Sequence, residues 1–179
     1  MRSRIILKIV ALVAIIMACS CHHKKLTEFK EIEVNGLYSL QMPWYLHSTD
    51  ELMAFKSPGI QQYEDSVGKI CLLVFDSLRE DIGISTLRVF YDSMVANPVI
   101  DSAQITLAHL VKVDNDSTYQ AEITGILNRN RVFSEIETIA TPDRFYFIVA
   151  WAGLERRDEL KPDMEKMLNS FKDISRSKK

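Results

Sequence analysis

Short segments of alternating hydrophobic and polar residues mark the first elements of the fold. Glu31–Val34 and Leu37–Met42 lie on either side of Asn35-Gly36, a dipeptide that suits the positive φ angles of a tight turn. Pro43 ends the second segment. The pattern therefore predicts a β-hairpin over residues 31–42.

The sequence after this hairpin loses the alternation. Trp44–Ser48 is predicted to be a loop, and Thr49–Phe55 a short helix capped by Ser48 or Thr49. Pro58-Gly59 then ends the predicted helix.

A second pair of strands is predicted at Ile60–Tyr63 and Lys69–Phe75. Every residue of Ile70–Phe75 is apolar, so both faces of this strand are hydrophobic. Such a strand belongs in the middle of a sheet that is covered on both sides.

Two segments show the spacing of amphipathic helices. In Ile84–Ala96, apolar residues recur every three or four positions until Pro98 stops the pattern. A second stripe of the same kind is formed by Leu160, Met164, Met167, Leu168 and Phe171. Each predicted helix is long enough to cover one face of a sheet.

Three further strands are predicted at Tyr119–Leu127, Val132–Ala140 and Phe145–Trp151, whereas the stretch before Tyr119 has no clear pattern. The short turns between them, the first around Arg129-Asn130, indicate an antiparallel meander. The expected fold class is α+β, an antiparallel β-sheet with helices packed on both faces.

The order of these segments resembles that of PsbP-like domains. The resemblance rests on Tyr38–Pro43, the double-faced strand, Phe145–Trp151 and a closing Asn169–Lys172, and it spans nearly the whole chain after residue 30. PsbP-like domains include a photosystem II accessory subunit and a nuclear import factor. The resemblance implies a non-enzymatic accessory or binding module and transfers no catalytic residue.

The composition places the chain among ordinary globular proteins, with 47% hydrophobic and 26% charged residues. Arg2, Arg4 and Lys8 precede Cys19, so the chain from Cys19 onward holds 19 of the 22 basic residues and all 24 acidic ones, a formal charge of −5. This excess of acid argues against nucleic acid as a partner, because phosphate binding needs clustered Lys and Arg.

The N-terminal segment has the layout of a secretory leader. Arg2 and Arg4 precede the apolar run Ile9–Met17, which is too short to span a bilayer as a permanent helix. Residues 1–18 are therefore predicted to be a cleaved signal peptide.

The end of this leader resembles the lipobox of bacterial lipoproteins, because Ile16–Cys19 has an apolar residue three before and a small residue directly before the cysteine. The resemblance implies that Cys19 is lipidated, with palmitate among its acyl chains, and becomes the first residue. Two or more acyl chains hold a protein stably on a membrane. Ser20 after the lipidated cysteine favours the outer membrane, with the domain in the periplasm.

Three alternatives to lipidation at Cys19 remain open. Cys21 is a second acceptor with a weaker surrounding motif. An ordinary signal peptide cut near Ala18 and an uncleaved anchor are the others. Residues 19–30 are predicted to be a tether, 31–173 a single α+β domain and 174–179 a basic tail.

Few residues of the predicted domain could carry chemistry. His47 and His109 are its histidines, and no hydrolase, nucleotide-binding, zinc-protease or dithiol motif occurs. We expect no enzyme activity, with a small membrane-tethered hydrolase that uses His47 or His109 as the alternative.

No metal or cofactor is predicted either. Cys21-His22-His23 lacks a fourth ligand at zinc spacing, and Asp114–Ser117 lacks the Gly and Glu that complete a calcium loop, so it is predicted to be a hairpin turn. Cys71 lies in the most apolar strand and is predicted to be a small buried hydrophobic residue. The charged run Glu155–Glu159 is predicted to be the solvated start of a helix.

Trp44 and Tyr45 form the candidate binding surface, because adjacent aromatic residues in a loop often contact a partner. The alternative is that one of them seals a sheet edge. The sequence thus predicts a lipid-anchored envelope protein that binds or assists another envelope protein.

Overall fold

The computed structural model describes residues 27–52, 59–66, 70–84, 86–96, 101–113 and 116–175. The predicted signal peptide, Cys19 and most of the predicted tether lie outside these residues.

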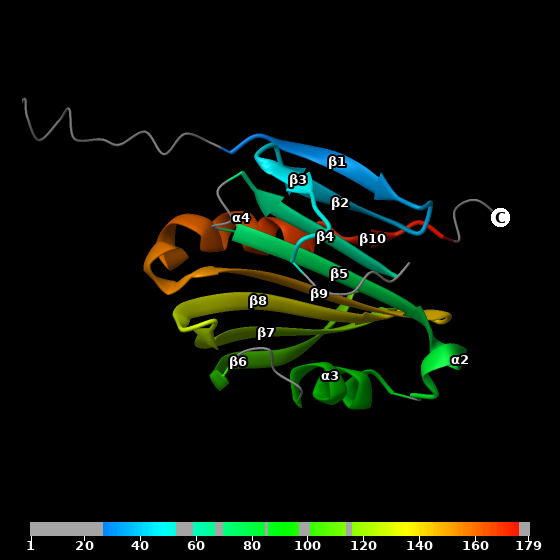
Figure 1. Cartoon of the computed structure of the whole chain (residues 1–179). Helices are drawn as coiled ribbons and strands as arrows, with labels where there is room; N and C mark the ends of the chain where they lie inside the picture. The colour runs from blue at the N-terminus through cyan, green and yellow to red at the C-terminus, as the bar shows by residue number, and fades with distance from the viewer. Residues whose placement is uncertain are drawn as a thin grey trace, which may run out of the picture.

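The largest element is a seven-stranded sheet in which neighbouring strands run antiparallel (Figure 1). Its strands, in spatial order, are β3 (Leu46–Ser48), β4 (Ile60–Asp65), β5 (Ile70–Leu78), β9 (Arg144–Gly153), β8 (Asn130–Ala140), β7 (Asp116–Leu127) and β6 (Asp101–Val113). The apolar strand predicted from the sequence, β5, lies inside the sheet between β4 and β9.

A separate three-stranded sheet contains the N-terminal hairpin. It has the order β1 (Phe29–Val34), β2 (Tyr38–Pro43), β10 (Lys172–Asp173). The helices are α2 (Arg79–Ile82), α3 (Leu87–Ala96), the one-turn 3₁₀ helix η1 (Leu154–Arg156) and α4 (Arg157–Asn169).

Helices α4 and α3 cover opposite faces of the seven-stranded sheet, as Figure 1 shows. Helix α4 and the three-stranded sheet pack on one face, where Leu40, Met164 and Ile148 belong to one hydrophobic core. Helix α3 packs on the other face, where Phe90 stacks on Phe145 with ring centroids 4.7 Å apart. The predicted fold class, an antiparallel sheet with helices on both faces, is confirmed, and the hairpin adds a second sheet to it.

The tight turns follow from local chemistry. Asn35 and Gly36 have φ angles of 52° and 68°, and the Leu37 N–H donates to Val34 O over 2.9 Å. Val34 pairs with Tyr38, so three residues connect β1 to β2. Asn128 and Arg129 have φ angles of 49° and 69° and form a two-residue turn between Leu127 and Asn130, one residue earlier than predicted.

The segment after the first hairpin is not the predicted loop and helix. Leu46–Ser48 is strand β3, which pairs with β4, and the Thr49 N–H extends this pairing by donating to Gln62 O over 2.9 Å. Thr49–Leu52 is therefore not helical, and residues 53–55 of the predicted helix lie outside the described part.

The predicted domain limits also need correction. Strand β1 begins at Phe29, inside the predicted tether, because Phe29 and Lys30 pair with Pro43 and Met42. At the other end, the N–H groups of Ile174 and Ser175 both donate to Leu37 O, so these residues belong to the domain and not to the tail.

None of the helices in the described part of the chain is long and apolar enough to cross a membrane.

Candidate functional site

Trp44 stands in the turn between β2 and β3, and 66% of it is exposed to solvent. Its backbone is fixed, since the Trp44 N–H donates to Glu28 O over 3.0 Å. Its ring meets that of Tyr45 edge to face, with centroids 6.1 Å apart. The turn thus presents a large apolar side chain on a rigid base.

Tyr45 is half-buried below Trp44. Its hydroxyl donates to Asp163 Oδ2 of α4 over 2.8 Å, and the Thr27 hydroxyl donates to the same oxygen over 2.7 Å. Burial and then the bond to Asp163 raise the pKa of Tyr45 above its usual value, so the hydroxyl remains a donor. Of the predicted pair, Trp44 is available for contact, whereas Tyr45 supports it.

Two lysines lie near this turn. The Lys166 ammonium of α4 sits 3.9 Å above the centre of the Phe29 ring, and Lys30 is exposed on β1. We call Trp44, Tyr45, Phe29, Lys30 and Lys166 the aromatic end. It is the end of the domain at which the described chain begins, beside Thr27.

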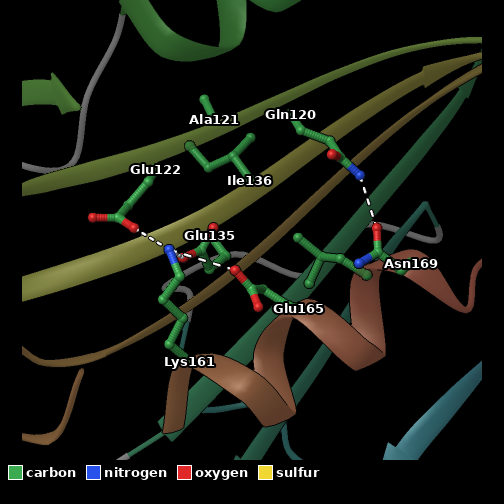
Figure 2. A pocket seen from close by; sticks show the side chains of 9 residues that line it. Gln120, Ala121, Glu122, Glu135, Ile136, Lys161, Glu165 and Asn169 are labelled. Atoms are coloured by element: carbon green, nitrogen blue, oxygen red, sulfur yellow. Dashed lines mark hydrogen bonds and ion pairs between the residues drawn. The ribbon is translucent and has the colours of Figure 1, made fainter. Parts of the chain in front are cut away.

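A second cluster joins α4 to strands β7 and β8, and we call it the polar seam (Figure 2). Its members are Gln120, Glu122, Glu135 and Glu137 from the strands and Arg157, Lys161, Glu165 and Asn169 from the helix. The strand carboxylates are buried although they occupy the polar face of β7 and β8, because α4 covers them.

Glu122 is the best-paired carboxylate of the polar seam. Arg157 donates to both of its oxygens, at 2.9 Å and 2.8 Å, and Lys161 donates to Oε2. Burial would raise the pKa of Glu122, but the hydrogen bonds from Arg157 and Lys161 outweigh burial and lower it. The prediction that the charged run Glu155–Glu159 is solvated is wrong for Arg157, because its guanidinium reaches over the sheet and pairs with Glu122.

Lys161 lies among three carboxylates, as Figure 2 shows. Besides Glu122, its ammonium contacts Glu135 at 3.1 Å and Glu165 at 3.5 Å. Burial alone would lower the pKa of Lys161, but the bonds to Glu122 and Glu135 raise it above its usual value. Lys161 is therefore permanently charged and tied in place, unlike a lysine tuned for proton transfer.

Glu137 is the least-paired acid of the polar seam. Gln120 Nε2 donates to its Oε1 over 3.3 Å, and the same amide donates to Asn169 Oδ1 over 2.9 Å. The other oxygen, Oε2, is buried without a hydrogen-bond partner in the described part of the chain. Burial raises the pKa of Glu137 to about 7.

A pocket of about 110 Å³ lies within the polar seam. Drug-sized ligands occupy pockets of roughly 300–1,000 Å³, so this one has room only for a few water molecules. Because its two cations already pair with Glu122 and Glu135, the polar seam serves to dock α4. It was not predicted from the sequence, because an alternating polar face normally indicates solvent. The available signal was the pair of basic residues one helical turn apart, Arg157 and Lys161.

The two histidines do not meet. His47 is exposed on β3 and His109 lies on β6, and these strands are the opposite edges of the seven-stranded sheet. Cys71 is buried in β5 as predicted, and burial raises the pKa of its thiol to about 12, which keeps it protonated.

The described residues contain no group of three or more His, Cys, Asp or Glu side chains able to hold a metal ion. Cys21-His22-His23 and Asp114-Asn115 lie outside them, and the remainder of the predicted turn, Asp116-Ser117, begins strand β7.

The arrangement of strands and helices defines the class: the chain has the α+β fold of PsbP-like proteins. The solution structure of cyanobacterial PsbP from Synechocystis sp. PCC 6803 is similar with a TM-score of 0.58 and 16% identity, over 86% of this chain and 97% of that one. The Ran-binding protein Mog1p of Saccharomyces cerevisiae is similar with a TM-score of 0.59 and 10% identity, over 84% and 98% of the two chains.

A crystal structure of a protein from Bacteroides thetaiotaomicron also matches, with a TM-score of 0.54 and 12% identity, over 83% of this chain and 49% of that one. No protein-family model matches the chain, and no curated protein matches it in sequence. Likeness at these identities establishes the fold and leaves function to the residues.

Proposed function

We propose that this chain is a lipoprotein of the bacterial envelope whose domain is a non-enzymatic binding or accessory module. It is anchored through acyl chains on Cys19, and its contact residue is Trp44. The exposure of Trp44 on a turn fixed by Glu28, Tyr45 and Asp163 carries the proposal. Large aromatic side chains on rigid supports lose little entropy on binding and dominate many interfaces.

Two further observations support a binding role over the hydrolase alternative. His47 is exposed on the edge strand β3, and the pocket of the polar seam has no histidine among its lining residues. Mog1p, which shares the fold, is a Ran-binding protein, so the fold is compatible with protein binding.

The anchor is tested by replacing its acceptor. Cys19→Ser abolishes incorporation of labelled palmitate in the bacterial host, and Cys21→Ser, the matched control, leaves it intact. Fractionation of the envelope then places the wild-type chain with the outer membrane, as Ser20 favours. Labelling that survives Cys19→Ser, or mature protein that still carries Met1, contradicts the proposal.

The binding role is tested at Trp44. Trp44→Ala lowers the affinity of the lipidated chain for isolated envelope components about tenfold or more, as expected for a central aromatic contact, with an unchanged melting temperature. Val89→Ala serves as control, because Val89 is 52% exposed on α3 at the opposite face of the sheet. Equal affinity of the two variants removes Trp44 as the contact residue.

A further inference from the structure

The aromatic end lies where the chain leaves the domain. Thr27 is hydrogen-bonded to Asp163, and Glu28, the next residue, accepts the Trp44 N–H at 3.0 Å. The segment that leads back toward Cys19 therefore starts one strand spacing from Trp44, about 5 Å.

The connection from Cys19 to this end is short. Seven residues lie between Cys19 and Thr27, and the eight Cα-to-Cα steps between these two residues span at most about 29 Å when fully extended. If Cys19 carries acyl chains, as proposed above, the aromatic end is the part of the domain held nearest to the lipid surface.

The chemistry of the aromatic end suits a membrane interface. Indole is amphipathic, and Trp is enriched at the level of lipid headgroups. Lys30 and Lys166 beside it, and Lys24 and Lys25 in the connecting sequence, are attracted to anionic lipids. Glu28, exposed next to Trp44, and Asp163 and Asp65 near Tyr45 weaken this attraction, whereas Arg156, also near Tyr45, adds to it.

The surroundings of Trp44 indicate which kind of envelope component this contact residue meets. Among the residues whose burial the structure describes, which excludes strand β6, the exposed large hydrophobic residues are Trp44, Val89 and Ile126. Val89 and Ile126 lie on α3 and β7, so Trp44 stands apart from a larger apolar patch. A stable protein interface needs roughly 800 Å² on each partner with an apolar centre, whereas interfacial insertion needs one amphipathic ring.

We propose that Trp44 inserts into the headgroup region of the membrane that holds the lipid on Cys19, and so orients the domain with its aromatic end toward the bilayer. This inference rests on the proposed anchor. The occupant of the Trp44 surface is then anionic phospholipid, and a protein that binds Trp44 is the competing outcome.

The experiment uses the lipidated full chain in vesicles of phosphatidylethanolamine and phosphatidylglycerol. The chain has two tryptophans, so Trp151→Phe leaves Trp44 as the only indole. We expect its emission to shift to the blue, its quenching by acrylamide to fall several-fold on reconstitution, and lipids brominated near the headgroup to quench it more than lipids brominated near the chain end.

A matched control moves the indole to the other face of the sheet. In the chain with Trp44→Phe, Trp151→Phe and Val89→Trp, brominated lipids leave the emission unchanged. If Trp151→Phe does not fold, the single variant Trp44→Phe is compared with wild type. Loss of the part of the tryptophan emission that brominated lipid quenches then gives the same information.

Flotation of the vesicles separates the two proposals. A chain that does not float lacks its anchor, which contradicts the proposed function. A chain that floats while Trp44 remains open to acrylamide and insensitive to brominated lipid overturns the insertion of Trp44. Shielding of Trp44 in native envelope membranes but not in protein-free vesicles also overturns it and assigns the residue to a protein partner.

Discussion

At the scale of single residues, Glu137 has the clearest consequence for stability. It is 6% exposed, and its one described hydrogen bond comes from Gln120. Burial without a basic partner raises the pKa of Glu137 to about 7, so the native state keeps this proton at pH values where an exposed glutamate is charged.

Stability should depend on pH through Glu137. Its pKa rises from about 4.5 to about 7 on folding, so the native state holds a proton that the unfolded chain releases between these values. The free energy of unfolding therefore falls by roughly 3 kcal/mol as pH rises from 4.5 to 7. Glu137→Gln removes this loss, so urea unfolding of residues 19–179 should show the variant more stable than wild type at pH 8.

Comparing wild type with Glu137→Gln separates the effect of Glu137 on stability from the effects of the neighbouring acids. Burial also raises the pKa of Glu135, against the effect of Lys161, whereas the pKa of Glu122 is lowered, but both residues are present in wild type and variant. A stability difference that is the same at pH 4.5 and pH 8 would show that folding does not raise the pKa of Glu137.

At the scale of elements, α4 is held by two kinds of contact. Leu160, Met164 and Met167 pack into the core, while Arg157 and Lys161 pair with buried carboxylates of β7 and β8. A buried charge that loses its partner is costly. Replacing a single member of one of these ion pairs should therefore destabilise the domain.

Lys161→Met should destabilise the domain by about 2–4 kcal/mol, because it leaves Glu135 without its cation and Glu122 with Arg157 alone. Lys166→Met on the same helix is the control. Lys166 is exposed and contacts the Phe29 ring, so its loss should cost about 1 kcal/mol or less. Thermal unfolding of both variants measures the difference, and equal losses would contradict the role given to the polar seam.

The elements predictable from sequence were those set by local chemistry. Asn35-Gly36 specified its turn because both residues tolerate positive φ, and the apolar run of β5 indicated a doubly covered strand. Strand β3 was missed because its identity depends on pairing with β4, more than ten residues away. Strand β6 was missed for a different reason: its partner β7 follows directly in the sequence, but its register is interrupted twice, which breaks the regular alternation.

The candidate sites were predictable to different degrees. Adjacent aromatic residues after Pro43 were visible in the sequence, but only the fold shows that Asp163 of α4 holds Tyr45 and leaves Trp44 exposed. The polar seam was invisible because Glu122 and Arg157 are 35 positions apart and meet only when α4 crosses the sheet.

At the scale of the whole molecule, the last residues close the three-stranded sheet. Strand β10 pairs with β2 through Lys172 and Asp173, and the N–H groups of Ile174 and Ser175 meet Leu37 O at 3.0 Å and 3.1 Å. The C-terminal segment therefore secures the hairpin to the end of α4.

A chain that ends at Phe171 should lose about 1–3 kcal/mol of stability, because a few backbone hydrogen bonds of roughly 1 kcal/mol each are removed. A chain that ends at Ser175 keeps these bonds and is the control, with wild-type stability expected. Urea unfolding compares the two, and equal stability would mean that β10 contributes nothing to the hold on the hairpin.

The shared acceptor at Asp163 has a mechanical consequence. A pull on the chain before Thr27 reaches the Thr27 and Glu28 bonds before it reaches the pairs of β1. The force passes through Asp163 into α4 and through Trp44 into the turn after β2. The edge strand β1 is thus relieved of the first load, and the domain resists being unzipped from this end.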